Sequence, residues 1–469
     1  MATYYVDATG GNDAWPGTEA QPWQTIAKVN GEAFNAGDSV LFKRGEMWVG
    51  TALTVTWSGA VGNPITFGAY DAGANPTIDG NDLANCITAA NQSYLRFENI
   101  EAAQGLDSGF QFTTCTYVEV VDCDAHDCGN DNLIFITASH HCMVLGGSFY
   151  NGYERVPGTI ISGIEVADGS YDIQIFGAIC RDNAGTLATG ITVHSHVATN
   201  MPYNITIDGC ACYGNADYGI QILKQDNTAD AARNIEVRNC VSYNNLQDGV
   251  RVYKSAGAIA YPNGVVVERC YCYGNTTYAY FFQGDNLSIR RNVFRGRGLI
   301  NASTATGFFN NTMYFETGLG LYPCYITNAR TNNVEVKNNV TYRTVAGGMA
   351  IGVDATVPAV GGVDVNYNLY YSSAEGVLAN RWHWRGVSQS WANWLLNSGQ
   401  DANSIAPADP LFINAAGENF KLQHGSPVLG VGVDVGLPYR GAAPDYGRWE
   451  AKWLSQQAHA IYHPVYRGI

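Results

Sequence analysis

The chain has 469 residues, far more than one compact hydrophobic core needs, so it forms either several packed domains or one elongated repetitive domain. A hydrophobic content of 46% with only 14% charged residues excludes a disordered chain, while 53 Gly and 29 Tyr favour many short strands and turns over a helix-rich fold. The net charge is −15 and no stretch concentrates Lys and Arg, which argues against a nucleic-acid partner.

No run in the sequence approaches the ~18 apolar residues of a membrane-spanning helix, so we expect no membrane partner. The opening Met1–Tyr5 lacks the basic region and the apolar core of a secretory signal. We therefore expect either an extracellular, secreted protein whose signal peptide is not part of this sequence, or a phage tail protein.

Residues 1–90 are expected to form an N-terminal cap and the first coils of a repetitive fold. The stretch Pro22–Lys28 has the pattern of a short helix, and Ala36–Phe42 follows it with alternating apolar residues. An open end of a repetitive β-fold exposes its core and unpaired strand edges. A helix at this position would therefore plug the first coil.

The middle of the chain aligns with itself at a spacing of 30 residues. Three blocks with the same arrangement of Cys, Tyr and Asn carry this repeat, Cys210–Asn215, Cys240–Asn245 and Cys270–Asn275. A short alternating strand precedes each block and another follows it. Strands this short cannot bury an apolar face alone and must stack on their neighbours. We therefore predict an all-β protein in which residues 91–375 form a right-handed parallel β-helix (a solenoid) of about ten coils.

The repeat also predicts how the interior of the coils is filled. Cys210, Cys240 and Cys270 would stack as small apolar side chains in a ladder, which we favour over disulfide bonds between adjacent coils. Asn215, Asn245 and Asn275 would lie at turns, since Asn tolerates left-handed backbone and can hydrogen-bond its counterparts above and below.

Residues 376–469 are expected to form the last coils and a second, aromatic cap. Four tryptophans gather at the start of this segment: Trp382, Trp384, Trp391 and Trp394. They could stack on sugar rings, but packing within the cap is the favoured interpretation. The whole chain then forms one elongated domain.

Motifs at both ends resemble those of right-handed β-helix proteins that act on polysaccharides, the broad pectate-lyase-like superfamily. The motifs are Tyr4–Val6, Pro22–Ile26, Gly62–Thr66, Asp409–Phe412 and Pro444–Gly447. The likeness covers nearly the whole chain and implies the fold and a polysaccharide ligand. It does not fix the reaction, because the matching motifs are caps and coils.

Closest in layout is a pectate lyase subfamily that holds calcium with a cluster of Asp residues and uses a Lys base on a neighbouring coil. This chain departs from that pattern, because Asp248 is the only carboxylate before Gly249 and Gln221 stands where the Lys is expected. The calcium site of that family is therefore not carried over. Ca²⁺ stays an open alternative at the acidic turn Asp127–Asp131, where an ordinary turn is the favoured interpretation.

Stacking of the strands predicts a ribbon of outward side chains. One column holds Ile134, Glu165, Thr192, Gln221, Arg251 and Phe281, the next holds Ile136, Ala167, His194, Leu223, Tyr253 and Gln283, and the adjoining turn holds Asp168, Ser195, His196, Lys224 and Lys254. Cationic and titratable groups thus gather on about four coils, roughly 15 Å of solenoid at ~4.8 Å per strand.

This ribbon suggests a polysaccharide lyase that cleaves an anionic, uronate-containing glycan by β-elimination. Arg251 would neutralise the uronate carboxylate, Lys224 or His194 would remove the proton at C5, and Tyr253 would protonate the leaving oxygen. Glu165 completes the predicted catalytic set. Predicted substrate-binding residues are Lys254, His196, Gln221, Asp248 and Arg155.

Two other functions stay open. A glycoside hydrolase needs two carboxyl groups flanking the bond, and Asp131, Glu165, Asp217 and Asp248 lie at or beside the same ribbon. A phage-type adhesin would bind a glycan without cleavage and would form a trimer, whereas an enzyme is expected to be a monomer. Because the ribbon should be exposed, Arg251→Ala and Lys224→Ala are predicted to lower turnover and leave the melting temperature nearly unchanged.

Overall fold

The computed structural model describes residues 1–195, 200–225, 233–258, 260–316, 322–375 and 380–450. Three long sheets run along the molecule, and from β2 to β40 each takes every third strand of the chain. Sheet 1 has 14 strands from β1 (Thr3–Val6) to β38 (Val363–Asn366), and sheet 2 has 13 strands from β3 (Met47–Val49) to β39 (Leu369–Ser372). Sheet 3 has 14 strands from β4 (Leu53–Val55) to β41 (Val387–Gln389).

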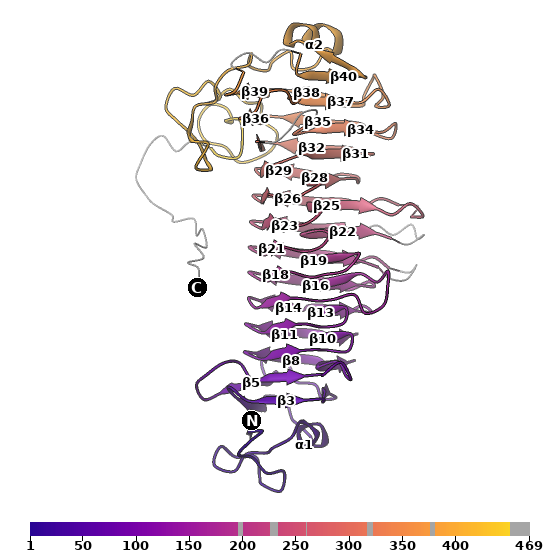
Figure 1. The fold of residues 1–469 in the computed structure, drawn as a ribbon, viewed down its shortest axis with the longest axis vertical. Coiled ribbons are helices and arrows are strands. Elements are labelled where there is room, and N and C mark those ends of the chain that lie inside the picture. The colour runs from indigo at the N-terminus through magenta and orange to yellow at the C-terminus, as the bar shows by residue number, and fades with distance from the viewer. Residues whose placement is uncertain (196–199, 226–232, 259, 317–321, 376–379, 451–469) are drawn as a thin grey trace.

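The chain therefore winds as a right-handed parallel β-helix, as the repeat predicts, and forms one elongated stack of coils (Figure 1). One coil consists of β20 (Tyr203–Asp208), β21 (Ala211–Tyr213) and β22 (Ile220–Lys224), one strand for each sheet. Alternation places Ile205, Ile207, Cys212 and Ile222 of this coil in the core with no exposed surface. The core is thus a continuous column shared by successive coils.

An asparagine ladder joins the coils at the turn between sheets 2 and 3. Asn215 Nδ2 donates to Asn245 Oδ1 at 2.9 Å, and Asn245 Nδ2 donates to Asn275 Oδ1 at 2.9 Å. The predicted ladder is therefore present, but the expectation of left-handed backbone at these residues is wrong. The residue before each Asn takes that conformation, with φ of 67° at Gly214 and 53° at Asn244. This turn directs the side chain of the following Asn into the coil, where it hydrogen-bonds the Asn side chains of the neighbouring coils.

The cysteines form no disulfide. All twelve are free and buried, including the predicted ladder of Cys210, Cys240 and Cys270. Each thiol of this ladder donates to a main-chain carbonyl, as from Cys240 Sγ to Arg238 O at 3.2 Å. The interpretation of these residues as interior filling is confirmed.

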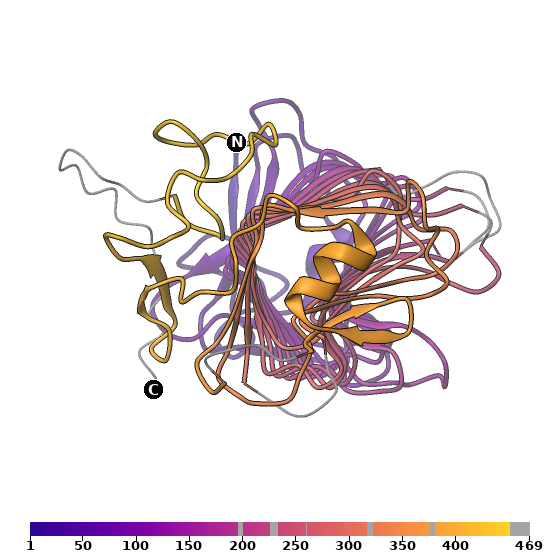
Figure 2. The same ribbon diagram turned by 90° about the horizontal axis from the view of Figure 1, so that it is seen from above.

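Both ends of the solenoid carry a short helix. Helix α1 (Ile26–Gly31) begins after Thr25, whose side chain accepts from Lys28 N, and it buries Ile26 and Val29 against the first coils. Helix α2 (Trp391–Ser398) lies across the other end of the coils, with Trp394 fully buried (Figure 2). Both helices occupy the cap positions that the sequence indicated.

The residues after α2 leave the end of the solenoid and pack on its side. A hairpin of β42 (Phe412–Asn414) and β43 (Asn419–Leu422) buries Phe412 and Phe420 against Tyr314 and Leu369 on the outer face of sheet 2. Figure 2 shows this C-terminal segment outside the coils. Among the described residues, no helix has the length and apolarity needed to cross a membrane.

Candidate active site

The register of sheet 3 brings the predicted ribbon residues together. The strands are β13 (Asp131–Ile136), β16 (Ile161–Ala167), β19 (Ala188–His194), β22, β25 (Asp248–Lys254) and β28 (Tyr278–Phe282). Glu165 pairs with Thr192, Thr192 with Gln221, and Gln221 with Arg251. In the second column, His194 pairs with Leu223 and Leu223 with Tyr253. Both predicted columns are therefore present.

The ribbon is buried, which contradicts the expectation of an exposed charged face. Glu165, His194 and Lys224 have no exposed surface, Gln221 is 6% exposed, and the side chain of Arg251 is 15% exposed. Neighbouring outward side chains lie only ~4.8 Å apart on adjacent strands, so large side chains cover one another. The prediction that Arg251→Ala and Lys224→Ala leave the melting temperature nearly unchanged assumed exposed side chains, so it is no longer justified.

One half of the ribbon is an acidic cluster around His194. Nε2 of His194 lies 3.3 Å from Oε1 of Glu165, and both side chains are fully buried. Asp131 lies on the adjacent coil, where its Oδ1 accepts a hydrogen bond from Ser162 N at 2.9 Å. Burial and the neighbouring charge of Glu165 raise the pKa of Asp131 well above its usual range. A buried carboxyl in this position is suited to hold a proton at neutral pH.

The other half of the ribbon is centred on Arg251. Its Nη1 donates to Oδ2 of Asp248 at 2.9 Å. Three rings surround the guanidinium, with centroid distances of 4.7 Å to Tyr218, 4.3 Å to Tyr253 and 4.6 Å to Phe281. The rings hold the cation in place by cation–π contact and limit its access to water.

Two carboxyl groups beside Arg251 have raised pKa values. Burial raises the pKa of Asp248 to about 6, although the charge of Arg251 lowers it. Burial likewise raises the pKa of Asp217 to about 6, against a hydrogen bond that the Asp217 side chain accepts from Gln247. Perturbed carboxyls that face a buried cation are characteristic of functional sites.

The remaining predicted substrate-binding residues lie at the margins. Lys254 pairs in register with Lys224, but its Nζ donates to Ala258 O and lies 5.1 Å from the ring of Tyr261, so it points into the following turn. Arg155 lies at the turns before β10 (Ser108–Thr113) and β13, where its Nη1 donates to Leu106 O at 3.1 Å. His196 falls outside the described residues.

The ribbon concentrates buried polar atoms that lack a hydrogen-bond partner among the described residues. They belong to four consecutive coils and are Ser162 Oγ, Thr189 Oγ1, Thr192 Oγ1, Asp217 Oδ2, Asp248 Oδ1 and Arg251 Nε. Folded proteins satisfy most of their buried polar groups, so such a concentration requires an explanation. A hydroxyl-rich, anionic ligand would supply both donors and acceptors to these atoms.

Sequence analysis missed Tyr218, Ser162 and Thr189. They share a third outward column with Asp131 and Asp248. Each residue of this column directly precedes an inward-facing residue near the start of its strand. The recurring Gly after Ser162, Thr189, Tyr218 and Asp248 is the signal that could have located this column.

The acidic turn considered for calcium is held by ion pairs. His126 Nδ1 lies 2.6 Å from Asp127 Oδ2, and His126 Nε2 lies 2.6 Å from Glu101 Oε1. The hydrogen bonds with these carboxylates raise the pKa of His126 to about 9. Within the described ranges, no three His, Cys, Asp or Glu residues form a group that could hold a metal ion.

Comparisons with known proteins agree on the fold. Residues 67–229 match a family model described as a right-handed β-helix region. A mannuronic acid specific polysaccharide family 6 lyase from human gut microbiota has a similar structure, with a TM-score of 0.55 and 12% sequence identity over 85% of this chain and 93% of that one.

Two further solved structures have lower TM-scores. A pectate lyase has a TM-score of 0.41 and 16% sequence identity, over 96% of this chain and 97% of that one. A lacto-N-biosidase from Eubacterium ramulus has a TM-score of 0.43 and 15% sequence identity, over 82% of this chain and 68% of that one. A search of curated proteins finds no match for the sequence. At these identities the likeness shows the fold alone, and the chain is a right-handed parallel β-helix protein.

Proposed function

We propose that this protein is a polysaccharide lyase that cleaves an anionic, uronate-containing glycan by β-elimination on the outer face of sheet 3. The observation that carries the proposal is the group of buried, unpartnered polar atoms around Arg251, since these atoms match a ligand with both a carboxylate and hydroxyls. The fold supports it, because one β-helix neighbour with a TM-score of 0.55 is described as a polysaccharide lyase.

In this proposal Arg251 neutralises the uronate carboxylate. One of its donors is used by Asp248, whereas Nε has no partner among the described residues and remains available to a substrate oxygen. A charge-assisted hydrogen bond in this ring-lined setting stabilises the negative charge that develops on the carboxylate when the C5 proton leaves.

Lys224 or His194 would take the C5 proton, and both lie on coils adjacent to that of Arg251 or one coil further. The electron pair of the C5–H bond forms the C4–C5 double bond, and the C4–O bond breaks. Tyr253, whose ring centroid lies 4.3 Å from the Arg251 guanidinium carbon, would give a proton to the leaving oxygen. Three adjacent coils, roughly 10 Å at the ~4.8 Å strand spacing, thus hold all three functions.

A glycoside hydrolase is the second candidate, and the carboxyls favour it. Asp217 and Asp248 lie on adjacent coils with pKa values of about 6, as a general acid requires if it is to hold a proton near neutral pH. A hydrolase would use a carboxyl pair, either these two or Asp131 with Glu165, in place of Lys224 and Arg251.

Incubation with alginate, pectate, glucuronan, sulfated fucan and neutral glycans distinguishes these functions. Ultraviolet absorbance that rises together with reducing ends would support the lyase, because elimination creates an unsaturated sugar. Reducing ends without absorbance would overturn it in favour of hydrolysis. Binding without either signal would indicate an adhesin. A parallel series with chelator tests whether a metal contributes to neutralising the substrate.

A further inference from the structure

A long groove runs over the outer face of sheet 1, which belongs to a different side of the solenoid from the ribbon. Its volume is about 790 Å³, and it crosses β8 (Ser93–Glu98), β11 (Thr116–Val121), β14 (Met143–Leu145), β17 (Tyr171–Phe176), β20 and β23 (Arg233–Arg238). Six coils at ~4.8 Å per strand give the groove a length of roughly 24 Å. This shape fits an extended chain better than a compact small molecule.

One wall of the groove is a column of residues in left-handed backbone conformation. Its members are Tyr94, Tyr117, His141, Asp172, Asn204 and Asn234, with φ between 52° and 57°. Tyr94 and Tyr117 stack at 4.6 Å with an interplanar angle of 4°, and His141 continues the stack at 4.9 Å. Because the rings stack on one another, they present edges and hydroxyl groups to a ligand, not their faces.

The same wall continues as an amide ladder. Asn234 Nδ2 donates to Asn204 Oδ1 at 3.0 Å, and Asn204 Nδ2 donates to Asp172 Oδ1 at 2.9 Å. Each amide nitrogen carries a second hydrogen that the ladder does not use. The wall therefore offers regularly spaced hydrogen-bonding groups along the solenoid.

The neighbouring column of the groove, two residues further along each strand, is polar and contains ion pairs. Glu119, Met143, Gln174, Thr206 and Glu236 follow one another in strict register. Arg96 lies 2.5 Å from Glu119 and 2.7 Å from Glu98. Arg238 lies 3.0 Å from Glu236 and 2.9 Å from Asp208, so each arginine is shared between two carboxylates. This surface is suited to hydroxyl groups of a ligand.

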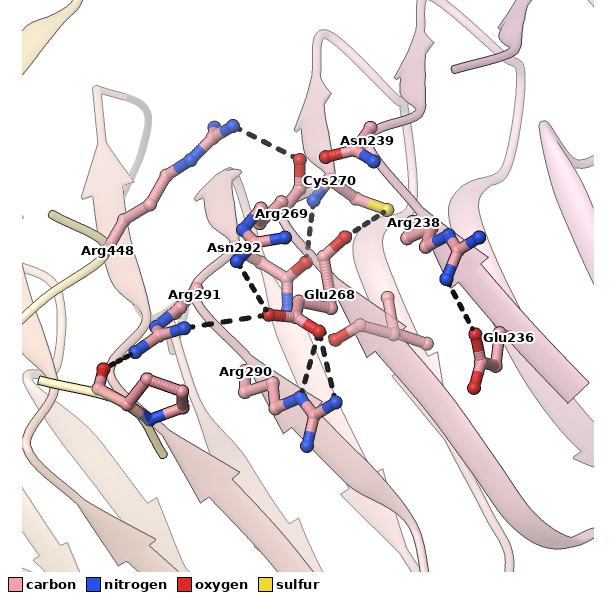
Figure 3. Close-up of polar contacts among 12 residues, drawn as sticks. Glu236, Arg238, Asn239, Glu268, Arg269, Cys270, Arg290, Arg291, Asn292 and Arg448 are labelled. Carbon is pink, nitrogen blue, oxygen red and sulfur yellow. Dashed lines mark hydrogen bonds and ion pairs between the residues drawn. The ribbon is translucent and has the colours of Figure 1, made fainter. Parts of the chain in front are cut away.

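An arginine cluster lies where the groove reaches Arg238. Figure 3 shows Arg238 beside Glu236, Arg269, Arg290 and Arg291 near Glu268, and Arg448 directed at the main-chain oxygen of Arg269. Glu268 lies within 3.0 Å of Arg290, 3.5 Å of Arg269 and 3.8 Å of Arg291, so three guanidiniums share one carboxylate. Arg269 is the most accessible of these three, with half of its side chain exposed.

Arg448 adds a cation that forms no ion pair with a carboxylate among the described residues. Its Nη2 donates to Arg269 O at 3.1 Å, and its guanidinium lies 4.8 Å from the ring of Trp449. Burial lowers the pKa of Arg448 to about 10 and raises the pKa of Glu450 to about 7, so Glu450 is only partly charged at neutral pH. The cluster thus has an excess of positive charge in a chain of net charge −15.

We propose that the groove of sheet 1 and the arginine cluster form a second, non-catalytic binding site for one strand of an anionic polysaccharide. The strand lies along the solenoid with its hydroxyls on the Tyr and Asn wall, and one of its carboxylates contacts Arg269. The choice of a uronate polymer as ligand rests on the proposed function, whereas the site itself rests on the groove and the charges.

Affinity electrophoresis in gels that contain alginate or polygalacturonate tests the site, with dextran as a neutral arm. Arg269→Ala should weaken retardation by the acidic polymers about tenfold at low salt, as expected for loss of one charge-assisted hydrogen bond, and the difference should shrink as salt increases. Arg181→Ala is the control, since Arg181 also pairs with one carboxylate, Asp182, but lies on sheet 2.

Tyr117→Phe removes one hydroxyl from the groove and should weaken binding of all acidic polymers at every salt concentration. Its control is Tyr243→Phe, because Tyr243 has the same stacking distances of 4.6 Å and 4.9 Å to its neighbours on sheet 2. Both substitutions keep the ring and hence the stack, so all variants should fold, which thermal denaturation checks.

Equal retardation of the groove variants and their controls would overturn the inference, and so would binding of dextran as strong as that of alginate. Loss of all retardation in Arg251→Ala would also overturn it, since the ribbon would then be the sole binding site. Cleavage of short oligosaccharides should be unchanged in Arg269→Ala. If no polymer is cleaved while Arg269 still controls retardation, the lyase proposal fails and the second site stands.

Discussion

The outer faces of sheets 1 and 3 are both built from strands stacked coil upon coil, yet their charged side chains differ in exposure and pairing. On sheet 1 the charges are accessible and paired, as Arg96 is with Glu98 and Glu119 at 2.7 Å and 2.5 Å. On sheet 3 Glu165 and Lys224 have no exposed surface, and Arg251 Nε lacks a partner among the described residues.

The difference in exposure arises from the connections that follow the strands and from the aromatic rings beside them. Only residues 209–210 separate β20 from β21, whereas residues 255–262 separate β25 from β26 (Asn263–Glu268) and include Tyr261 beside Lys254. Rings on the face of sheet 3 also cover Arg251. A regular strand pattern therefore fixes which residues are neighbours, while connections and ring size decide whether those neighbours are solvated.

Lys224→Met should produce the largest effect, a loss of about 10²- to 10⁴-fold in turnover, if Lys224 is the base. Lys254→Met on the next coil should retain activity within a few-fold, because Lys254 Nζ is bound to Ala258 O. Initial rates followed by ultraviolet absorbance measure both variants. Equal losses of turnover in the two variants would contradict the distinction between Lys224 and Lys254. Full activity of Lys224→Met would assign the role of base to His194.

Arg251→Ala should lower turnover about 10²- to 10³-fold and also destabilise the fold, unlike a surface substitution. It leaves Asp248, which has no exposed surface, without its cation, and breaking such a pair costs about 3 kcal/mol. Urea denaturation measures the loss. In the double variant Arg251→Met with Asp248→Asn, stability should return while activity stays low. If Arg251→Ala alone leaves stability unchanged, the pair is solvated and the prediction is wrong.

The pH dependence of stability should carry the signature of the buried ribbon. Asp217 and Asp248 have folded pKa values of about 6, above the ~3.9 of an unfolded Asp, so the folded state holds their protons longer. Their contribution favours folding at pH 4 and is lost as the pH rises to about 6, by up to roughly 3 kcal/mol for each group. Denaturation of Asp217→Asn between pH 4 and pH 7.5 should show a smaller fall than the parent protein, and an unchanged slope would contradict the assignment.

The smallest effect is expected on the open face. Arg96→Ala removes two solvated ion pairs of sheet 1 and should cost less than about 1 kcal/mol, with the difference vanishing at high salt. Thermal denaturation at two salt concentrations measures it. A loss as large as that of Arg251→Ala would remove the contrast between the two faces.

The sequence predicts the register of the ribbon because the repeat of 30 residues has no insertion between Cys210 and Asn275, so counting alone aligns Gln221 with Arg251. It does not predict burial. The cover over Arg251 comes partly from Tyr218, whose ring centroid lies 4.7 Å from the guanidinium carbon, and counting residues does not reveal where a ring points.

The free thiols of the core can report where the solenoid opens during unfolding. Burial raises the pKa of Cys123 and Cys142 to about 12, and the twelve thiols are spread over coils from Cys86 to Cys324. A thiol reagent can therefore modify a given coil only after that coil separates from its neighbours. The order in which the cysteines become labelled would show from which end, and through which coil, the protein begins to unravel.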